Sequence, residues 1–208
     1  MSAYGRLVAA CYNRWYEPAE EAGLADLRRA QLEPAAGRVL EIGAGTGLNL
    51  PYYPDAVEEL VVAEPDPPML KRLVPRLADV PARTSVSRAP AEELPFDDGS
   101  FDAVVTTFVL CTVRSTARSL AEVRRVLRPG GRLLFLEHVR SEHDPRLARW
   151  QDRLRPIWLR VGYGCNCNRR TLQDVEASGF EVESVRSGDL PKALPLWRPY
   201  VLGAATAG

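Results

Sequence analysis

A glycine-rich loop directly after a buried strand constrains the fold of this chain more than any other feature. Residues 38–43, RVLEIG, form a short apolar run that stops at a glycine, which is typical of a buried strand. Gly43, Gly45 and Gly47 then allow the backbone to turn tightly and to approach a ligand without a Cβ in the way. The pattern predicts a sheet whose first strand ends in a binding loop.

Strand-like and helix-like segments alternate along the rest of the chain. Further strands are expected at residues 59–64, 84–89, 101–110, 132–139, 181–187 and 200–205. Helices are expected at residues 4–30 (broken at Pro18), 45–53, 66–77, 115–127, 145–161 and 171–180. The alternation predicts an α/β, Rossmann-like fold with a seven-stranded, mostly parallel sheet, helices on both faces and an antiparallel last strand.

Composition excludes several classes of function. The formal net charge is zero and the pI is about 6.8, so no overall field attracts nucleic acid or acidic lipid. The N-terminus lacks the pattern of a signal peptide, and no apolar run is long enough for a membrane span. Four unevenly placed cysteines suggest reduced thiols. We therefore expect a cytoplasmic protein that is not integral to a membrane and has no nucleic-acid partner.

Two acidic residues mark the ends of the first two predicted strands. A carboxylate at Glu41 suits a cationic group of a ligand and would repel a pyrophosphate. Glu64 ends the second strand, where an acid can accept hydrogen bonds from both hydroxyls of a ribose. Separately, each acid could be structural, the first in a tight turn and the second on the surface. Together with the glycine loop they indicate an adenosine-containing ligand.

Four motifs carry a resemblance to a known family. They are LEIGAGTG (40–47), the acid Glu64, AEELPFDDGSFDAV (91–104) and VRRVLRPGGRLLFLEHV (123–139). In this order and spacing, the chain resembles class I S-adenosylmethionine-dependent methyltransferases over roughly residues 35–140. The glycine spacing, together with Glu41, departs from the dinucleotide fingerprint GxGxxG and disfavours the rival interpretation as a nicotinamide dehydrogenase.

The resemblance implies S-adenosylmethionine as the cofactor and assigns residues to it. The methionine part would pass over Gly43, Ala44 and Gly45, with its ammonium near Glu41. The ribose hydroxyls would bind Glu64. The remaining implied cofactor contacts are Pro65, Met69, Ala91 and Glu92 around the adenine, and Thr107 after the fourth strand.

Motifs in the C-terminal half narrow the resemblance to one branch of this family. VVTTFVLCTV (104–113), LEHV (136–139) and GC followed by RRT (164–171) resemble the small alkyl-thiol methyltransferases, called methyltransferase-like protein 7 in mammals. That branch lies beside the ubiquinone/menaquinone and phosphatidylethanolamine methyltransferases. It implies in-line methyl transfer to a small hydrophobic acceptor, first of all a thiol. The alternatives are N- or O-methylation of a lipid, quinone or natural product, and a non-catalytic protein that binds S-adenosylmethionine as a regulator.

The whole chain of 208 residues fits one methyltransferase domain with four parts. These are an N-terminal helical cap (1–33), a cofactor-binding core (34–140), an acceptor-side lid (141–170) and a C-terminal helix with strands (171–208). The lid contains an amphipathic segment, 143–164. This segment could close over a hydrophobic acceptor, rest on membrane lipid or simply cover the core. The oligomeric state stays open.

His138 is the predicted base or acceptor-orienting group. It follows the fifth strand at the binding edge, and an imidazole titrates in the range that a thiol acceptor needs. A purely structural histidine is the alternative. Further acceptor contacts are predicted, with ordinary packing as the alternative for each, at Tyr12, Tyr16, Cys111, Trp150 and Cys165.

The segment GYGCNCNRRT (162–171) raises the question of a metal site. Structural zinc takes four ligands, and Cys165 and Cys167 with only two histidines elsewhere make a poor set. No metal is therefore expected. Methyl transfer passes directly to the acceptor and needs no catalytic cysteine, so the loop around Cys165 either lines the acceptor pocket or only turns the chain.

Overall fold

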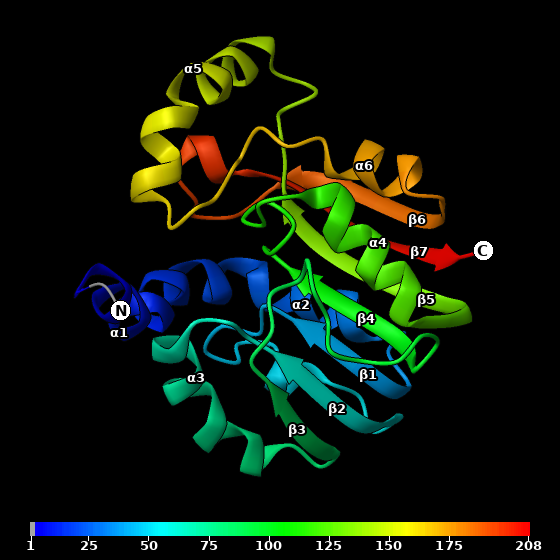
Figure 1. Ribbon diagram of the computed structural model, residues 1–208. Coiled ribbons are helices and arrows are strands. Elements are labelled where there is room, and N and C mark those ends of the chain that lie inside the picture. Colours follow the sequence, from blue (N-terminus) through cyan, green and yellow to red (C-terminus); the bar gives the residue numbers. More distant parts are fainter. Residues whose placement is uncertain (1–2) are drawn as a thin grey trace.

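The computed structural model describes residues 3–208 as one seven-stranded sheet between helices (Figure 1). The strands are β1 (Gly37–Ile42), β2 (Val57–Ala63), β3 (Arg83–Ser87), β4 (Phe101–Thr107), β5 (Leu127–His138), β6 (Phe180–Asp189) and β7 (Pro199–Ala207). Their order in the sheet is β3-β2-β1-β4-β5-β7-β6. Neighbours from β3 to β5 pair in parallel, whereas β7 is antiparallel to both β5 and β6. The predicted fold class is confirmed. Residues 1 and 2 of the predicted N-terminal cap lie outside the described residues.

Helices cover both faces of the sheet and its carboxyl edge. They are α1 (Ala3–Ala19), α2 (Ala25–Leu32), α3 (Pro67–Leu73), α4 (Thr116–Val126), α5 (Pro145–Val161) and α6 (Thr171–Ala177). A π-helical turn, η1 (Glu20–Leu24), joins α1 to α2, and short 3-10 turns occur at η2 (Leu50–Tyr52), η3 (Val74–Asp79) and η4 (Pro195–Trp197). Figure 1 shows α1 and α5 beyond the sheet edge at which the parallel strands end.

Alternation along the strands produces two cores, one on each face. Leu40 and Ile42 of β1 pack in the core that also contains the buried stripe of α4 and Val175 of α6. Val39 points the other way, into the core formed with Leu32 of α2 and Leu73 of α3. This period of two is what a strand buried on both faces requires.

The order of the strands determines where a ligand can bind. The chain builds outward from β1 to β3 and then returns to place β4 on the other side of β1. Loops at the carboxyl ends of β1 and β4 therefore diverge, and such a switch point is where open α/β sheets bind their ligands. The glycine loop follows β1, and Phe108 follows β4 with a left-handed φ of 58°.

Two predicted helices differ from the structure. The predicted break at Pro18 is wrong: α1 continues through Pro18 to Ala19, and the chain bends instead in the π turn at Gly23, whose φ is 124°. A proline removes one backbone hydrogen bond, whereas a left-handed residue ends the helical path itself. The helix expected at 45–53 is also wrong. Left-handed backbone at Gly45 and Gly47 leaves only the 3-10 turn η2 there.

The fourth strand is shorter than the predicted 101–110 and stops at Thr107. Residues 109–111 turn away because their amide groups donate to the carboxylate of Glu137 on β5. Among residues 3–208, no helix combines the length and apolar character that crossing a membrane requires.

Candidate active site

The glycine loop forms an open cradle at the end of β1. A Cβ on Gly43 would collide with the Val109 side chain, at 2.5 Å. At Gly45 a Cβ would meet only the Gly43 carbonyl oxygen, 3.9 Å away, and would stand in open space. The loop borders a narrow cavity, whose lining residues are Tyr12, Arg28, Glu41, Gly43, Ala44, Gly45, Leu48, Asn49 and Thr107. Five predicted cofactor residues, Thr107 among them, thus line one cavity.

Glu64 lies at the end of β2, beside this loop, and is 6% exposed. Its carboxylate accepts hydrogen bonds from the backbone N–H groups of Gly45 and Asp66, both at 2.8 Å. Burial raises the pKa of Glu64, and the two backbone bonds act against that rise. The carboxylate is therefore fixed in position next to the cradle, as an acid that accepts ribose hydroxyls must be.

Glu41 occupies the floor of the cavity and is almost fully buried. One carboxylate oxygen accepts from Asn49 Nδ2 and the other from the Tyr53 hydroxyl, each at 2.9 Å. Burial raises the pKa of Glu41 to about 7, although hydrogen bonds from Tyr53 and Asn49 oppose the rise. A cationic ligand group entering the cavity would favour the ionised form.

Arg28 of α2 is a site residue that the sequence did not reveal. It is 3% exposed, lines the cavity and bonds Asn49 Oδ1 at 2.7 Å and Glu20 Oε1 at 2.9 Å. Its guanidinium also lies 5.8 Å from the centroid of the Phe108 ring. An arginine in an amphipathic helix carries no motif, and only the fold shows that it points inward. The cavity thus holds one fixed cation as well as a carboxylate.

The four residues predicted around the adenine differ in their burial and in the parts of the structure that they contact. Pro65 is exposed beside Glu64. Met69 is buried and packs with Val8 and Ala9 of α1. Ala91 belongs to the core beneath α4. The Glu92 carboxylate accepts from the backbone N–H groups of Arg114 and Ser115, so it fixes the start of α4.

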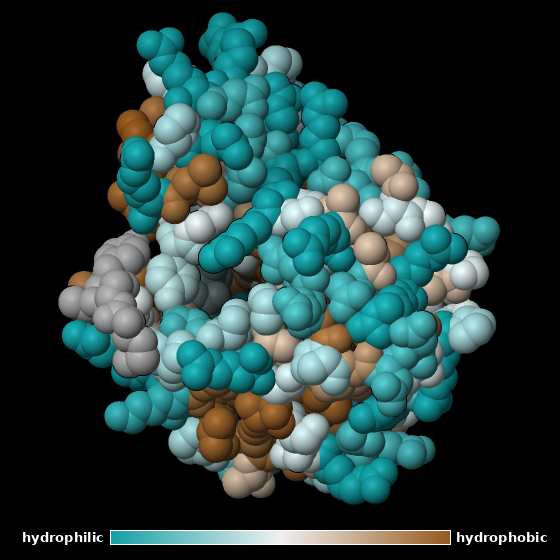
Figure 2. Space-filling model, in the orientation of Figure 1, coloured by the Kyte–Doolittle hydropathy of each residue, from teal (hydrophilic) through white to brown (hydrophobic). Residues whose placement is uncertain are grey.

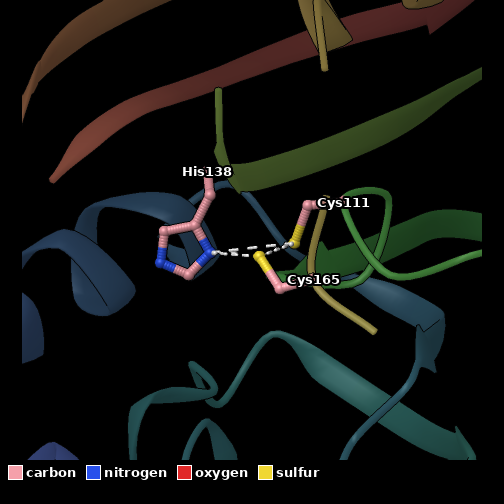
Figure 3. A group of neighbouring side chains, drawn as sticks. All are labelled: Cys111, His138 and Cys165. Atoms are coloured by element: carbon pink, nitrogen blue, oxygen red, sulfur yellow. Dashed lines mark hydrogen bonds between the residues drawn. The ribbon is translucent and has the colours of Figure 1, made fainter. Parts of the chain in front are cut away.

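His138, Cys111 and Cys165 converge at the carboxyl edge although they come from three distant segments (Figure 3). Nδ1 of His138 lies 3.7 Å from Sγ of Cys111 and 3.8 Å from Sγ of Cys165, and the two sulfurs are 3.7 Å apart. All three side chains are buried. Of the predicted acceptor residues, the structure thus brings these three into direct contact.

The two thiols of this cluster differ in acidity. The pKa of Cys165 is lowered to about 5, first by hydrogen bonding with Cys111 and then by His138. The same bond, with burial, raises the pKa of Cys111 well above its ordinary value. A buried pair that has lost one proton resists losing the second.

Aromatic rings enclose the cluster and connect it to the cavity. Phe108 stacks on His138 with a centroid distance of 4.2 Å, and Tyr16 lies 6.2 Å from Phe108. Tyr12, which lines the cavity, is 4.8 Å from Tyr16. On the other side Trp197 lies 6.2 Å from His138. The predicted tyrosines therefore bridge the two parts of the site.

The predicted role of Trp150 is not supported by its position. Trp150 is 54% exposed on α5, whereas Trp158 packs edge-on against Trp197 at 4.6 Å. Other apolar side chains of α5, Ile157 and Val161, are exposed as well, and Figure 2 shows brown residues along this helix. The inward face of α5 instead carries Ala148 and Gln151, which are buried.

A wider groove of about 600 Å³ lies elsewhere, between the start of α5, α6 and the ends of β6 and β7. None of the predicted cofactor residues lines it. We therefore place the chemistry at the smaller cavity and the neighbouring cluster.

Comparison with known proteins agrees with this geometry. Residues 40–135 match a methyltransferase domain family. Thiol S-methyltransferase TMT1B of Homo sapiens is 39% identical over 181 residues, which cover 84% of this chain and 73% of that protein. The ubiquinone/menaquinone C-methyltransferase UbiE of Proteus mirabilis is 39% identical over 154 residues, 72% of this chain and 59% of its own. A crystal structure titled as a SAM-dependent methyltransferase, possibly a histamine N-methyltransferase, from Thermotoga maritima superposes with a TM-score of 0.73 over 98% of each chain. At 23% identity, that structure shows the fold alone.

Fold, glycine cradle and paired acids together define a class I methyltransferase that uses S-adenosylmethionine. Within this class, the chain belongs to the family of the thiol S-methyltransferases TMT1A and TMT1B. The residues present fit the cofactor: Gly45 leaves open the space that a side chain would fill, and Glu41 and Glu64 are buried acids beside it.

Proposed function

We propose that this enzyme methylates the sulfur of a small hydrophobic thiol. The observation that carries the proposal is the buried cluster of Cys111, His138 and Cys165, walled by aromatic rings and joined to the cofactor cavity through Tyr16. The family relationship to proteins named thiol S-methyltransferases supports it. An apolar wall suits an alkyl or aryl thiol and keeps water away from the reacting atoms.

Three residues of this chain would hold the cofactor. Glu41 would bind its ammonium, Arg28 its carboxylate and Glu64 its ribose hydroxyls. Arg28 and Glu41 lie on the same cavity, bridged by Asn49, and so match the two opposite charges of an amino acid. When bound, S-adenosylmethionine supplies a methyl group on a positively charged sulfur.

The cluster around His138 would supply the acceptor with its reactive form. A free thiol has a pKa of about 8.5, so loss of its proton limits the reaction at neutral pH. His138 is positioned to take that proton, and Phe108 holds its ring in place. The acceptor sulfur then forms a bond to the methyl carbon as the bond from that carbon to the cofactor sulfur breaks. The products are a thioether and S-adenosylhomocysteine.

A radiolabelled-methyl assay tests the proposal. We expect label in an alkanethiol and none in the alcohol or amine of the same chain length, because only the thiol readily loses its proton to become a nucleophilic anion. Label transferred to the amine, a phenol or phosphatidylethanolamine vesicles, and not to the thiol, would contradict it. His138→Ala should lower kcat by about 100-fold or more. His143→Ala, at an exposed position, should leave kcat unchanged.

A further inference from the structure

We propose that Cys111, His138 and Cys165 form a binding site for a zinc ion, with a fourth position open to the acceptor sulfur. The expectation of no metal rested on counting ligands close to Cys165 in the sequence. The fold instead brings one ligand from each of three segments, the turn after β4, the end of β5 and the loop after α5. Three protein ligands with one open position are typical of catalytic zinc.

The distances match a shared ion. Bonds of about 2.3 Å to sulfur and about 2.0 Å to nitrogen place the ligand atoms of tetrahedral zinc about 3.5 to 3.8 Å apart. The three edges of the cluster measure 3.7, 3.7 and 3.8 Å. Figure 3 shows both sulfurs on the side of the imidazole that carries Nδ1. One ion can therefore contact all three atoms at ordinary bond lengths.

Hydrogen bonding alone does not account for this arrangement. A neutral imidazole nitrogen either donates one hydrogen bond or accepts one, so Nδ1 can serve only one sulfur well. Both sulfurs nevertheless approach it closely, Cys111 to 3.7 Å and Cys165 to 3.8 Å. The two sulfurs form no disulfide, since they are 3.7 Å apart and bonded sulfurs lie about 2.05 Å apart. A cation between the three atoms explains why both sulfurs approach the same nitrogen.

The chemistry of the ligands selects the ion. Thiolate and imidazole are soft or borderline ligands, which zinc accepts and magnesium or calcium do not. Two thiolates also neutralise a divalent ion, and a neutral His138 adds no charge, so the buried site carries none. The carboxylate of Glu137 is turned away and holds the backbone N–H groups of residues 109–111.

The surroundings hold the ligands in place before an ion arrives. Asn166 N–H donates to the carbonyl of Cys111 at 2.7 Å, which joins the two loops that carry the cysteines. Glu137 fixes the turn that contains Cys111, and Phe108 stacks on the His138 ring. Such outer contacts orient metal ligands and set their affinity.

This inference rests on the proposed function for its role in catalysis, though not for metal binding itself. A thiol that binds zinc loses its proton to solvent, since the ion stabilises the thiolate. Its sulfur would then accept the methyl group as described above, and the neutral thioether would leave the ion. In this form of the site His138 holds the ion, and the ion replaces the imidazole as the group that activates the acceptor.

Measurements of metal content and cobalt spectra test the metal site independently of methyl transfer. The full chain, free of affinity tags, is stripped with a chelator and reloaded with Zn²⁺ or Co²⁺. We expect about one zinc per chain, and thiolate-to-cobalt charge-transfer bands with tetrahedral d–d bands. Cys111→Ser, Cys165→Ser and His138→Ala should each lose at least about 90% of the bound metal.

Matched controls come from the same chain. Cys167→Ser changes another buried cysteine of the same loop, and His143→Ala removes the other histidine. Both should keep the metal, and affinity for S-adenosylhomocysteine confirms the fold of every variant. A native chain that takes up no zinc or cobalt would overturn the site, whether or not the variants fold. Equal metal loss in Cys167→Ser and Cys165→Ser would do the same.

Activity separates this inference from the proposed function. Loss of thiol methylation on chelation, with recovery on adding Zn²⁺, supports both. A chain that binds zinc but methylates no thiol keeps the metal site and refutes the thiol acceptor. A chain that methylates thiols at full rate without metal refutes the catalytic zinc and keeps the acceptor.

Discussion

Gly45 and Gly130 share a left-handed backbone with free space around the missing side chain, but only Gly45 borders the cofactor cavity. Replacing either by alanine should cost about 1 to 2 kcal/mol of stability, because an L-residue is strained at positive φ. Gly45→Ala should in addition weaken the binding of S-adenosylhomocysteine at least about tenfold, since the methyl group of the alanine enters the cradle. Urea unfolding and calorimetry measure the two effects. Equal affinity in both variants would show that the cofactor does not pass over Gly45.

Glu41 makes the stability of the protein depend on pH. Its pKa is about 7 in the folded chain, against an ordinary 4.5. Between these values the unfolded chain has already lost the proton that the folded chain keeps, so stability falls as pH rises from about 4.5 to 7 and then levels off. Glu41→Gln removes this fall in stability, because glutamine does not ionise. We expect the free energy of unfolding of the variant to exceed that of the native chain by about 3 kcal/mol at pH 8 and by almost nothing at pH 4.5.

Urea unfolding of both proteins at several pH values checks this difference. The comparison cancels other buried acids, such as Glu137, that titrate in the same range. The same variant should bind S-adenosylhomocysteine more weakly at pH 8, because the ammonium loses its carboxylate. A stability difference independent of pH would mean that folding does not raise the pKa of Glu41.

For single residues, position along the sequence pointed to the acids Glu41 and Glu64 but not to the cation Arg28. Glu41 and Glu64 lie at ends of strands, and strand ends are recognisable from apolar runs followed by a polar residue. Arg28 could not be found this way, since many arginines of the predicted helices look alike and only packing turns one inward. Trp150 and Trp158 both lie in the amphipathic segment 143–164, but tertiary contacts determine which of them packs inward, and only Trp158 contacts Trp197.

The turn after β4 depends on a single side chain of the neighbouring strand. Glu137 on β5 accepts the backbone N–H groups of Val109, Leu110 and Cys111 at 3.0 to 3.3 Å. Glu137→Gln would place an N–H₂ group opposite these donors and leave at least one of them unpaired. We expect a loss of about 1 to 3 kcal/mol in the free energy of unfolding at pH 4.5, measured by urea. At that pH the Glu137 carboxyl, whose pKa burial raises to about 7, is protonated in the folded chain, so relief of a buried charge does not offset the loss.

An exposed acid provides the control for this variant. Glu142→Gln, on the loop after β5, should change stability by less than about 0.5 kcal/mol. If Glu137→Gln behaves like Glu142→Gln, the turn is held by other contacts, and Cys111 does not depend on β5 for its position.

Periodicity located the elements well but not their ends. The strands and the larger helices were expected close to their observed ranges, because burial fixes which side chains alternate. The ends depend on particular contacts instead. β4 ends at Thr107 because Phe108 has a left-handed φ and Glu137 accepts from the amide groups of residues 109–111. Left-handed backbone at Gly45 and Gly47 prevents a helix that the apolar pattern of 45–53 favoured.

Within the described residues 3–208, β7 alone joins β5 to β6 in the sheet. Removing residues 199–208 would leave both neighbours with an unpaired edge and expose the core face that β7 covers. We expect an insoluble or molten chain without cooperative unfolding or affinity for S-adenosylhomocysteine. Removing Gly208 alone, which is exposed, should have no effect. Circular dichroism, gel filtration and calorimetry distinguish the outcomes, and native affinity in the longer truncation would contradict the expectation.

The position of β7 also has a consequence for biosynthesis. Ribosomes deliver the chain from its N-terminus, so β1 to β5 and the cofactor loops emerge in an order in which all of them can pair. β6 follows but has no partner until β7 arrives, and Tyr200 of β7 lies opposite His138. The half of the enzyme that holds the cofactor can therefore form during translation, while the acceptor half is completed last. In the interval, the open edge of β5 could pair with another chain, which a chaperone would prevent.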